Sequence, residues 1–143
     1  MNAKYDVLVV DDNEATRLLI ARVLCEELPI TVTLSASAED AQRRADERRF
    51  DLILLDLLMP GTGGMHVLER VRREDGPNKT TPVVVVSVLG DAETVARCKS
   101  LGATHHVVKP ILRESLTEVV RAHLAVAPKA RVADSSRDQS PLA

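Results

Sequence analysis

Five side chains capable of ionic or nucleophilic chemistry each follow a short apolar segment of the sequence. They are the carboxylates of Asp11, Asp12 and Asp56, the hydroxyl of Ser87 and the ammonium group of Lys109. Where carboxylates cluster they repel one another, and a cation or a proton relieves the repulsion. Oxygen ligands without histidine or cysteine among them favour a hard cation such as Mg²⁺. Asp56 then has two roles open to it, as metal ligand and as nucleophile toward phosphorus, while Lys109 and Ser87 would bind phosphoryl oxygens.

The elements that must position these residues are short apolar runs alternating with stretches of helical periodicity. The sequence predicts strands at 5–10, 31–35, 51–55, 82–87 and 104–108, and helices at 14–27, 38–48, 65–73, 92–101 and 113–126. The runs at 7–10, 52–55 and 83–86 are unbroken apolar quartets, which is typical of strands buried on both faces of a parallel sheet. We therefore predict an α/β fold with an open, doubly wound parallel sheet.

Finer patterns add three expectations to this fold. The run at 31–35 alternates between polar and apolar residues, which predicts an edge strand. Gly102 follows the fourth helix, where a left-handed cap is expected. In the first helix, the side chains that we expect to face the sheet are Leu18, Leu19, Val23 and Leu24.

The five polar residues all follow strand ends in this arrangement. In an open α/β sheet, ligands bind outside the carboxyl ends of the strands, near the point where the strand order reverses. Asp11 and Asp12 follow the first strand, Asp56 the third, Ser87 ends the fourth and Lys109 follows the fifth. We therefore expect three carboxylates, a hydroxyl and an ammonium group to meet at one edge of the sheet.

Single members of this group have ordinary structural roles open to them. Asp12 could cap the first helix, and Ser87 could be a turn residue. A capping role does not explain Asp56, because Pro60 and Gly61 follow it before the next predicted helix. Capping and turn roles explain single residues, but they do not explain why all five stand at strand ends, so the group indicates a functional site.

Four blocks of the sequence resemble the receiver domain of two-component response regulators. They are VDDN at 10–13, LLDLLMPG at 54–61, VS at 86–87 and GATHHVVKP at 102–110. The resemblance covers about residues 4–126, and the order, spacing and strand placement of the blocks all agree. It divides the chain into a single receiver domain, 1–126, of the kind found in chemotaxis receivers, and a flexible tail or linker stub, 127–143.

The resemblance implies a flavodoxin-like sheet of order 2-1-3-4-5 and a signalling function rather than an enzymatic one. Asp56 would be phosphorylated by a partner histidine kinase or phosphotransfer protein. Asp12 and Asp56 would bind Mg²⁺ with the backbone carbonyl of Leu58, and Asp11 would act through water. Ser87 and Lys109 would contact the phosphoryl group, and the bond between Lys109 and Pro110 would be cis.

The resemblance also implies a switch on the face formed by the fourth helix, the fifth strand and the fifth helix, where a protein target would bind. Phosphorylation would draw Ser87 toward the new dianion, and a side chain three residues before Lys109 would move into the vacated space. His106 stands at that position, usually occupied by Tyr or Phe, and gives the switch a titratable side chain. The alternative is that His106 is an exposed edge-strand residue, which is how we interpret His66, His105 and His123. Hydrolytic water would pass between Leu58 and Leu89, which cannot hydrogen-bond it, so we predict a long-lived acyl phosphate.

The composition excludes several other classes of function. The chain has one Tyr, one Phe and no Trp, so its core must be aliphatic and nucleic-acid binding by stacking is excluded. The 19 basic and 21 acidic residues give a net charge of −2, which shows no basic surface for nucleic acid or anionic membranes. No apolar run approaches a membrane span, and the polar start does not predict a signal peptide. Cys25 and Cys98 lack metal-type spacing and are expected to be reduced thiols of a cytoplasmic protein.

Three alternatives compete with a phosphoacceptor receiver. A phosphatase that uses aspartyl-phosphate chemistry would need a second acid at the position of Leu58. A flavin-binding relative would need a hydroxyl-rich phosphate loop and aromatic residues, where this chain has Asp11 and Asp12. A receiver used only for protein contacts, without phosphorylation, is disfavoured by the complete set of acids, Ser87 and Lys109. The output also stays open: the receiver acts alone, or it belongs to a larger regulator whose output domain lies outside this sequence.

Overall fold

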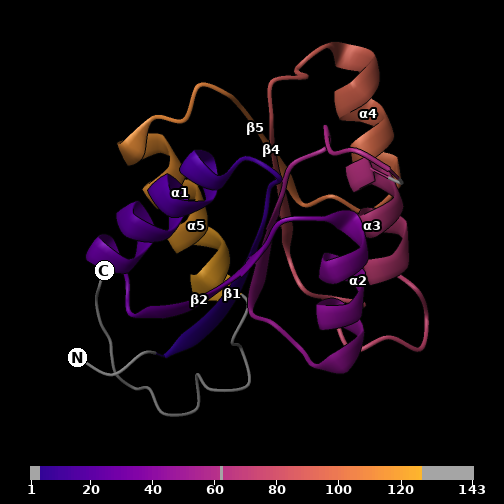
Figure 1. Ribbon diagram of the computed structural model, residues 1–143, viewed down its shortest axis with the longest axis horizontal. Coiled ribbons are helices and arrows are strands. Elements are labelled where there is room, and N and C mark those ends of the chain that lie inside the picture. The colour runs from indigo at the N-terminus through magenta and orange to yellow at the C-terminus, as the bar shows by residue number, and fades with distance from the viewer. Residues whose placement is uncertain (1–3, 62, 127–143) are drawn as a thin grey trace.

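The computed structural model describes residues 4–61 and 63–126 of the 143-residue chain. Strands and helices alternate throughout these ranges, as the sequence predicts (Figure 1). The strands are β1 (Tyr5–Val10), β2 (Ile30–Ser35), β3 (Leu52–Leu55), β4 (Val83–Ser87) and β5 (His105–Val108). The helices are α1 (Glu14–Glu27), α2 (Ala38–Glu47), α3 (Gly63–Val71), α4 (Ala92–Ser100) and α5 (Arg113–Val126). The predicted tail at 127–143 lies outside the described residues.

The five strands form one parallel sheet of order β2-β1-β3-β4-β5, which confirms the predicted fold class and strand order. β1 pairs with β2 on one side and with β3 on the other, so the strand order reverses between β1 and β3. The alternating strand β2 is at an edge, as its pattern predicts. Because ligands of such sheets bind where the order reverses, the carboxyl ends of β1 and β3 are the place to look for a site.

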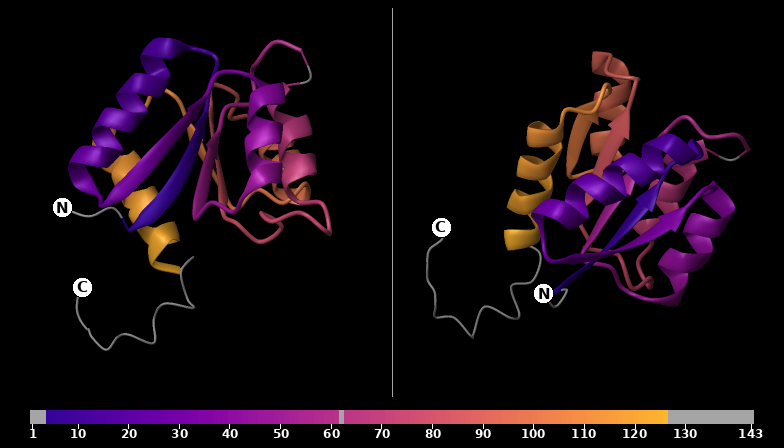
Figure 2. Two further views of the ribbon diagram at one scale, coloured as in Figure 1. Left: turned by 60° about the horizontal axis from the view of Figure 1, so that its bottom comes forward. Right: turned by 60° about the vertical axis from the view of Figure 1, so that its left-hand side comes forward.

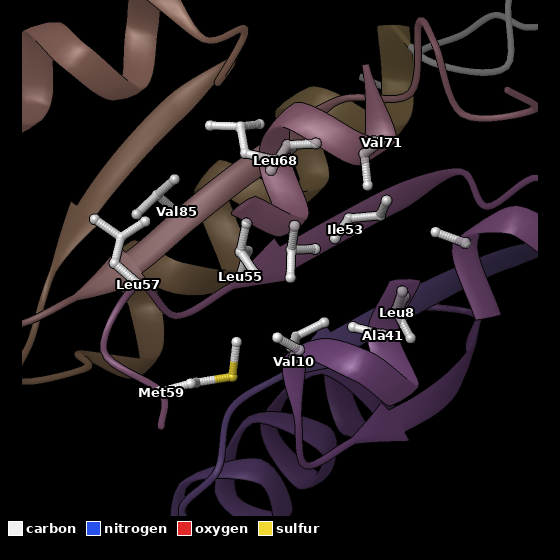
Figure 3. Close-up of a cluster of buried hydrophobic side chains, with 14 of the residues drawn as sticks. Leu8, Val10, Ala41, Ile53, Leu55, Leu57, Met59, Leu68, Val71 and Val85 are labelled. Carbon is white, nitrogen blue, oxygen red and sulfur yellow. The ribbon is translucent and has the colours of Figure 1, made fainter. Parts of the chain in front are cut away.

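Helices cover both faces of the sheet (Figures 1 and 2). Val7 and Val9 of β1 pack in one core cluster with residues of α1 and α5. Leu8 and Val10, which alternate with them, pack in a second cluster with residues of α2, α3 and α4. Figure 3 shows this second cluster, in which aliphatic side chains of the strands meet those of α2 and α3. The unbroken apolar quartets thus have a helix layer on each side, as expected for buried parallel strands.

The expected inward face of α1 was wrong in part. Leu18 and Leu19 are 53% and 46% exposed, and the buried residues of the helix are Ile20, Val23 and Leu24. With 3.6 residues per turn, these three lie on one stripe, and Leu18 lies on nearly the opposite side from Ile20. The predicted apolar face of α1 was therefore broader than the stripe of residues that packs against the sheet.

The ends of the elements agree with the predictions to within two residues, and α3 differs most, because it begins at Gly63. Asn13 rather than Asp12 caps α1, since its side-chain oxygen accepts the backbone N–H of Thr16 at 2.9 Å. Gly102 has a φ of +108°, which confirms the left-handed cap after α4. The Lys109–Pro110 bond is cis, as the resemblance implied. None of the helices within the described ranges is long and apolar enough to cross a membrane.

A buried asparagine joins three segments at the other end of the sheet, near the start of β3. Asn78 is 1% exposed, and its amide donates to the backbone oxygens of Ala45 and Arg48 at 2.7 and 2.8 Å. Its side-chain oxygen accepts from the backbone N–H of Phe50 at 2.8 Å and from the Thr81 hydroxyl at 2.9 Å. This side chain therefore satisfies polar groups of the α2–β3 connection that the core would otherwise leave without partners.

Candidate functional site

The candidate site lies at the carboxyl edge of the sheet, where parallel pairing brings the strand ends level. Val10 of β1 pairs with Leu55 of β3, and the backbone N–H of Asp56 donates to the Val10 oxygen at 2.9 Å. At the other side of the sheet, the Lys109 N–H donates to the oxygen of Ser87 at 2.8 Å. The ladder thus continues one residue past β3 and β5, and it fixes the first polar residue after each strand.

Three of the predicted residues form an acidic cluster at this edge. Asp11, Asp12 and Asp56 each offer a carboxylate oxygen, and these oxygens all lie within 4.8 Å of one another. Asp11 and Asp56 are buried, at 2% and 5% exposed, whereas Asp12 is exposed. The donor set is made of oxygen alone and is partly open to solvent, which fits a hard dication such as Mg²⁺.

The ammonium group of Lys109 reaches this cluster from the end of β5. Its Nζ is 2.9 Å from Oδ2 of Asp11 and 3.5 Å from Oδ2 of Asp56. Burial lowers the pKa of Lys109, but the hydrogen bond to Asp11 and the negative charges of both carboxylates outweigh it and raise the pKa above its usual value. Lys109 is therefore a fixed cation at neutral pH, held 98 residues along the chain from its partner Asp11.

The pKa of Asp56 is subject to opposing influences from its surroundings. Burial is the largest influence and raises the pKa of its carboxyl, and the charge of Asp11 raises it further. The backbone N–H of Leu58, which donates to Oδ1 at 3.2 Å, and the charge of Lys109 lower it in part. The net shift is upward, so the ionised form of Asp56 is costly in this environment and gains from a further cation.

Residues that the sequence reasoning did not single out hold the two buried carboxylates in place. Oδ1 of Asp11 accepts the backbone N–H of Asn13 at 2.9 Å, and the Arg17 side chain donates to the Asp11 backbone oxygen at 2.9 Å. A Cβ added to Gly64 would lie 2.2 Å from the backbone oxygen of Asp56, so only glycine lets α3 begin this close to the site. The signal for Asn13 was its place before the first helix, whereas nothing local marks Arg17 or Gly64.

Ser87 and His106 are linked through the backbone of one residue, Leu89, in the β4–α4 loop. Ser87 is fully buried, and its Oγ accepts the backbone N–H of Leu89 at 3.3 Å. The oxygen of Leu89 in turn accepts a hydrogen bond of 2.7 Å from Nε2 of His106. His106 is half-buried, so it is not merely an exposed residue of an edge strand. Its Nδ1 is buried and has no hydrogen-bond partner within the described chain.

The structure thus brings together at one edge the acids and the lysine that the sequence marked, with Ser87 buried at the end of the adjacent strand. A doubly wound sheet of this order, with paired acids after β1, an acid after β3 and a lysine after β5, defines a receiver-type signalling domain.

The comparisons with known proteins agree with this class. The family model of the response regulator receiver domain matches residues 7–121, so the chain belongs to the response regulator receiver domain family. Receiver domains are the phosphoacceptor signalling domains of two-component systems, in which they interact with histidine kinases or phosphotransfer proteins, and a Mg²⁺ site is typical of the family.

Similar proteins include longer signalling proteins, of which the match covers a part, and a chemotaxis protein. The chain is 34% identical over 121 residues to the sensory/regulatory protein RpfC of Xanthomonas campestris; the match covers 84% of this chain and 16% of that protein. It is 29% identical to the chemotaxis protein CheY4 of Vibrio cholerae, with a TM-score of 0.78 over 84% of this chain and 98% of that one. The receiver domain of the sensor histidine kinase PA1611 from Pseudomonas aeruginosa, whose structure has a magnesium ion in its active site cleft, shares the fold at 24% identity, covers 86% of this chain and 99% of that one, and has a TM-score of 0.77.

Proposed function

We propose that Asp56 accepts a phosphoryl group and that Asp11, Asp12 and Asp56, with the backbone carbonyl of Leu58, hold Mg²⁺ beside it. The observation that carries this proposal is the geometry of one sheet edge. Three carboxylates offer oxygens within 4.8 Å of one another, and the Lys109 ammonium group contacts two of them. A set of acids with one fixed cation suits a reaction that gathers negative charge on phosphoryl oxygens.

The donor in this proposal is a phosphohistidine of a partner histidine kinase or phosphotransfer protein. An oxygen of the Asp56 carboxylate forms a bond to phosphorus while the bond between phosphorus and the donor nitrogen breaks. The imidazole keeps that electron pair and takes up a proton from solvent. Lys109 pairs with one equatorial oxygen of the transferring group. Mg²⁺, when bound, supplies the remaining neutralisation of phosphoryl charge. We expect the domain to act in the cytoplasm, where histidine kinases are phosphorylated from ATP.

The two acids after β1 have different roles in this site. Both oxygens of Asp11 already accept hydrogen bonds, from Asn13 N–H at 2.9 Å and from Lys109 at 2.9 Å. Asp12 is exposed, and no hydrogen bond or ion pair of its carboxylate competes for the ion within the described residues. Asp12 and Asp56 are therefore the better direct ligands, and Asp11 acts through water, as the sequence resemblance implied.

The loop after β4 supports a route from the site to the surface. Attraction of Ser87 toward a phosphoryl group on Asp56 would break its hydrogen bond with the N–H of Leu89. Because the oxygen of the same residue holds His106, movement of Leu89 releases the imidazole as well. We propose that the backbone of Leu89 couples phosphorylation to the face formed by α4, β5 and α5, to which a protein target or an output domain binds.

Two other functions fit less well. A phosphatase using an aspartyl-phosphate intermediate lacks its second acid, because Leu58 stands at that position and is 50% exposed with no acidic group in its place. A receiver that serves only for contact would have no use for a buried Asp56 whose ionised form is costly. In both of these cases Asp56 would not retain phosphoryl groups.

Phosphorylation by a small donor tests the proposal without knowledge of the kinase. Wild-type protein incubated with acetyl phosphate and Mg²⁺ is expected to gain one phosphoryl group by intact-protein mass spectrometry. Asp56→Asn abolishes this gain, as does removal of Mg²⁺ with EDTA. Asp75→Asn, which changes a side chain 87% exposed on the surface, is the matched control and leaves uptake unchanged. A wild-type protein that takes up no phosphoryl group, or an Asp56→Asn variant that takes it up fully, would overturn the proposal.

A further inference from the structure

Two histidines outside the acidic site face each other across β5 and α5. His105 is the first residue of β5, and His123 lies in the last turn of α5. Their ring centroids are 5.6 Å apart, and the ring planes are inclined at 54°. α5 lies beside β5 (Figure 2), and Val107, two residues after His105 on the same side of the strand, packs in the core cluster that contains α5. His106 points to the opposite side, where it binds the oxygen of Leu89.

Hydrogen bonding leaves the imidazole of His123 with one nitrogen available. Its Nδ1 donates to the backbone oxygen of Val119 at 2.8 Å, which makes Nδ1 the protonated nitrogen and leaves the lone pair of Nε2 open. A backbone carbonyl that fixes the tautomer in this way is the usual support of a histidine that binds a metal. Burial lowers the pKa of His105, and the neighbouring His123 and His106 lower it further. The neutral imidazole, which is the form that binds metals, is therefore favoured at neutral pH.

We propose that His105 and His123 together bind a borderline transition-metal dication such as Zn²⁺ or Ni²⁺. Two imidazoles bound to one tetrahedral ion at about 2.0–2.1 Å have ring centroids roughly 5 Å apart, close to the separation in this structure. Imidazole nitrogen selects such ions over Mg²⁺, whereas the oxygen cluster around Asp56 selects the reverse. The two sites therefore differ in chemistry as well as in place.

The number of ligands sets the strength of this site. Across the described ranges, the only group of three or more histidine, cysteine or carboxylate residues placed to share an ion is the acidic cluster. The histidine pair therefore supplies two ligands, and water completes the coordination. Such an ion joins the start of β5 to the end of α5, and by binding only the folded chain it stabilises that chain against unfolding.

Metal titration of the tag-free protein separates this site from the acidic one. Ni²⁺ is titrated by calorimetry into wild type, His105→Gln, His123→Gln and Asp56→Asn, all with saturating Mg²⁺. We expect one Ni²⁺ site in wild type and in Asp56→Asn, and at least tenfold weaker binding in each histidine variant. His66→Gln is the matched control and binds like wild type, because His66 is exposed on α3, which packs on the other face of the sheet from α5. Uptake of phosphoryl groups from acetyl phosphate shows that the histidine variants are folded.

A spectroscopic measurement on wild type keeps the test independent of the variants. Cu²⁺ bound to the protein at one equivalent, with Mg²⁺ in excess, is expected to show hyperfine coupling to two imidazole nitrogens in its paramagnetic resonance spectrum. Coupling to no nitrogen would contradict the proposal. So would loss of Ni²⁺ binding in Asp56→Asn with retention in both histidine variants, because that result assigns the ion to the acidic cluster.

Discussion

Asp56 draws its reactivity from neighbours on other strands rather than from its own segment. Burial makes its charge costly and raises its pKa, while Lys109 at 3.5 Å and the Leu58 N–H at 3.2 Å partly offset that cost. The negative charge of Asp56 is thus costly, in a place where an added cation is favourable. This combination of burial and a neighbouring cation is what distinguishes Asp56 from the exposed acids of the surface.

The acyl phosphate on Asp56 is expected to be long-lived. Leu58 is 50% exposed beside Asp56, and its side chain offers no hydrogen bond to a water that approaches the phosphorus. We expect phosphorylated wild type to decay slowly in the presence of Mg²⁺, and Leu58→Asn to decay about tenfold faster, since one oriented water bond amounts to about 1.4 kcal/mol. The decay is followed by mass spectrometry after removal of the phosphoryl donor.

A matched variant controls for the general effect of a polar surface residue. Leu112→Asn changes an exposed leucine on the segment after Pro110 and is expected to decay like wild type. Loss of the phosphoryl group from wild type within seconds would refute the prediction, as would equal decay of wild type and Leu58→Asn.

Among the secondary-structure elements, the strands that are buried on both faces were the easiest to predict from the sequence. The quartets of β1, β3 and β4 are buried on both faces, so their apolar runs carry the full signal. The buried face of α1 was misjudged, because Leu18 and Leu19 lie outside the stripe that meets the sheet. The hydrogen bonds of Asn78 could not be predicted, because its partners lie up to 33 residues away and only the fold brings them together.

Helix α2 provides a prediction of pH-dependent stability. The Asp40 carboxylate accepts hydrogen bonds from Arg43, Arg44 and the Ser35 hydroxyl. Burial opposes ionisation, but these bonds outweigh it and lower the pKa of Asp40 to about 2. A carboxyl whose folded-state pKa lies below its unfolded value stabilises the fold above about pH 4 and loses that contribution as the pH falls toward 2.

Asp40→Asn is therefore expected to lower the free energy of unfolding by about 1 kcal/mol at pH 7, after allowance for solvent screening of a partly exposed side chain. The difference from wild type should shrink as the pH falls from about 4 toward 2. Urea unfolding at several pH values measures it, with Asp75→Asn as the control. A difference that is constant across this range would show that Asp40 does not act through its charge.

Two asparagines of different environment give a second test at this scale. Asn78→Ala leaves buried backbone groups of Phe50, Ala45 and Arg48 without partners, so we expect a loss of about 3 kcal/mol in the free energy of unfolding. Asn13→Ala removes only the cap of an exposed helix end and the bond to the Thr16 hydroxyl, and should lower it by about 1 kcal/mol. Urea denaturation compares the two variants directly. Equal losses in the free energy of unfolding would contradict the role of Asn78 as a buried hydrogen-bonding partner.

Among the described residues, two groups of buried polar side chains lie at opposite ends of the sheet. At the end of the sheet near Asn78, the buried polar groups are hydrogen-bonded to one another and fix the connection between α2 and β3. At the carboxyl end, two buried carboxylates share one lysine, and the pKa of Asp56 is raised by burial. Without a bound cation, the buried carboxylates at this edge repel one another. We therefore expect their charges to lower the free energy of unfolding of the protein.

This division predicts a stabilising substitution in the site itself. A carboxyl whose pKa is raised on folding destabilises the fold increasingly as the pH rises above its unfolded value, so Asp56 lowers stability at pH 7. Asp56→Asn is therefore expected to raise the free energy of unfolding by about 1 kcal/mol without Mg²⁺. Mg²⁺ should stabilise wild type and have little effect on the variant. Thermal denaturation with and without the ion checks both, and a variant less stable than wild type in the absence of Mg²⁺ would contradict the expectation.

Chemical mapping of the modified residue shows whether phosphorylation occurs at Asp56. Borohydride reduces an aspartyl phosphate to homoserine, which marks the modified position in a peptide mass spectrum. After treatment with acetyl phosphate and Mg²⁺, we predict homoserine at position 56 and unchanged Asp at positions 11 and 12. Homoserine at either of those two positions instead, or a phosphorylated protein that borohydride leaves unchanged, would contradict the account.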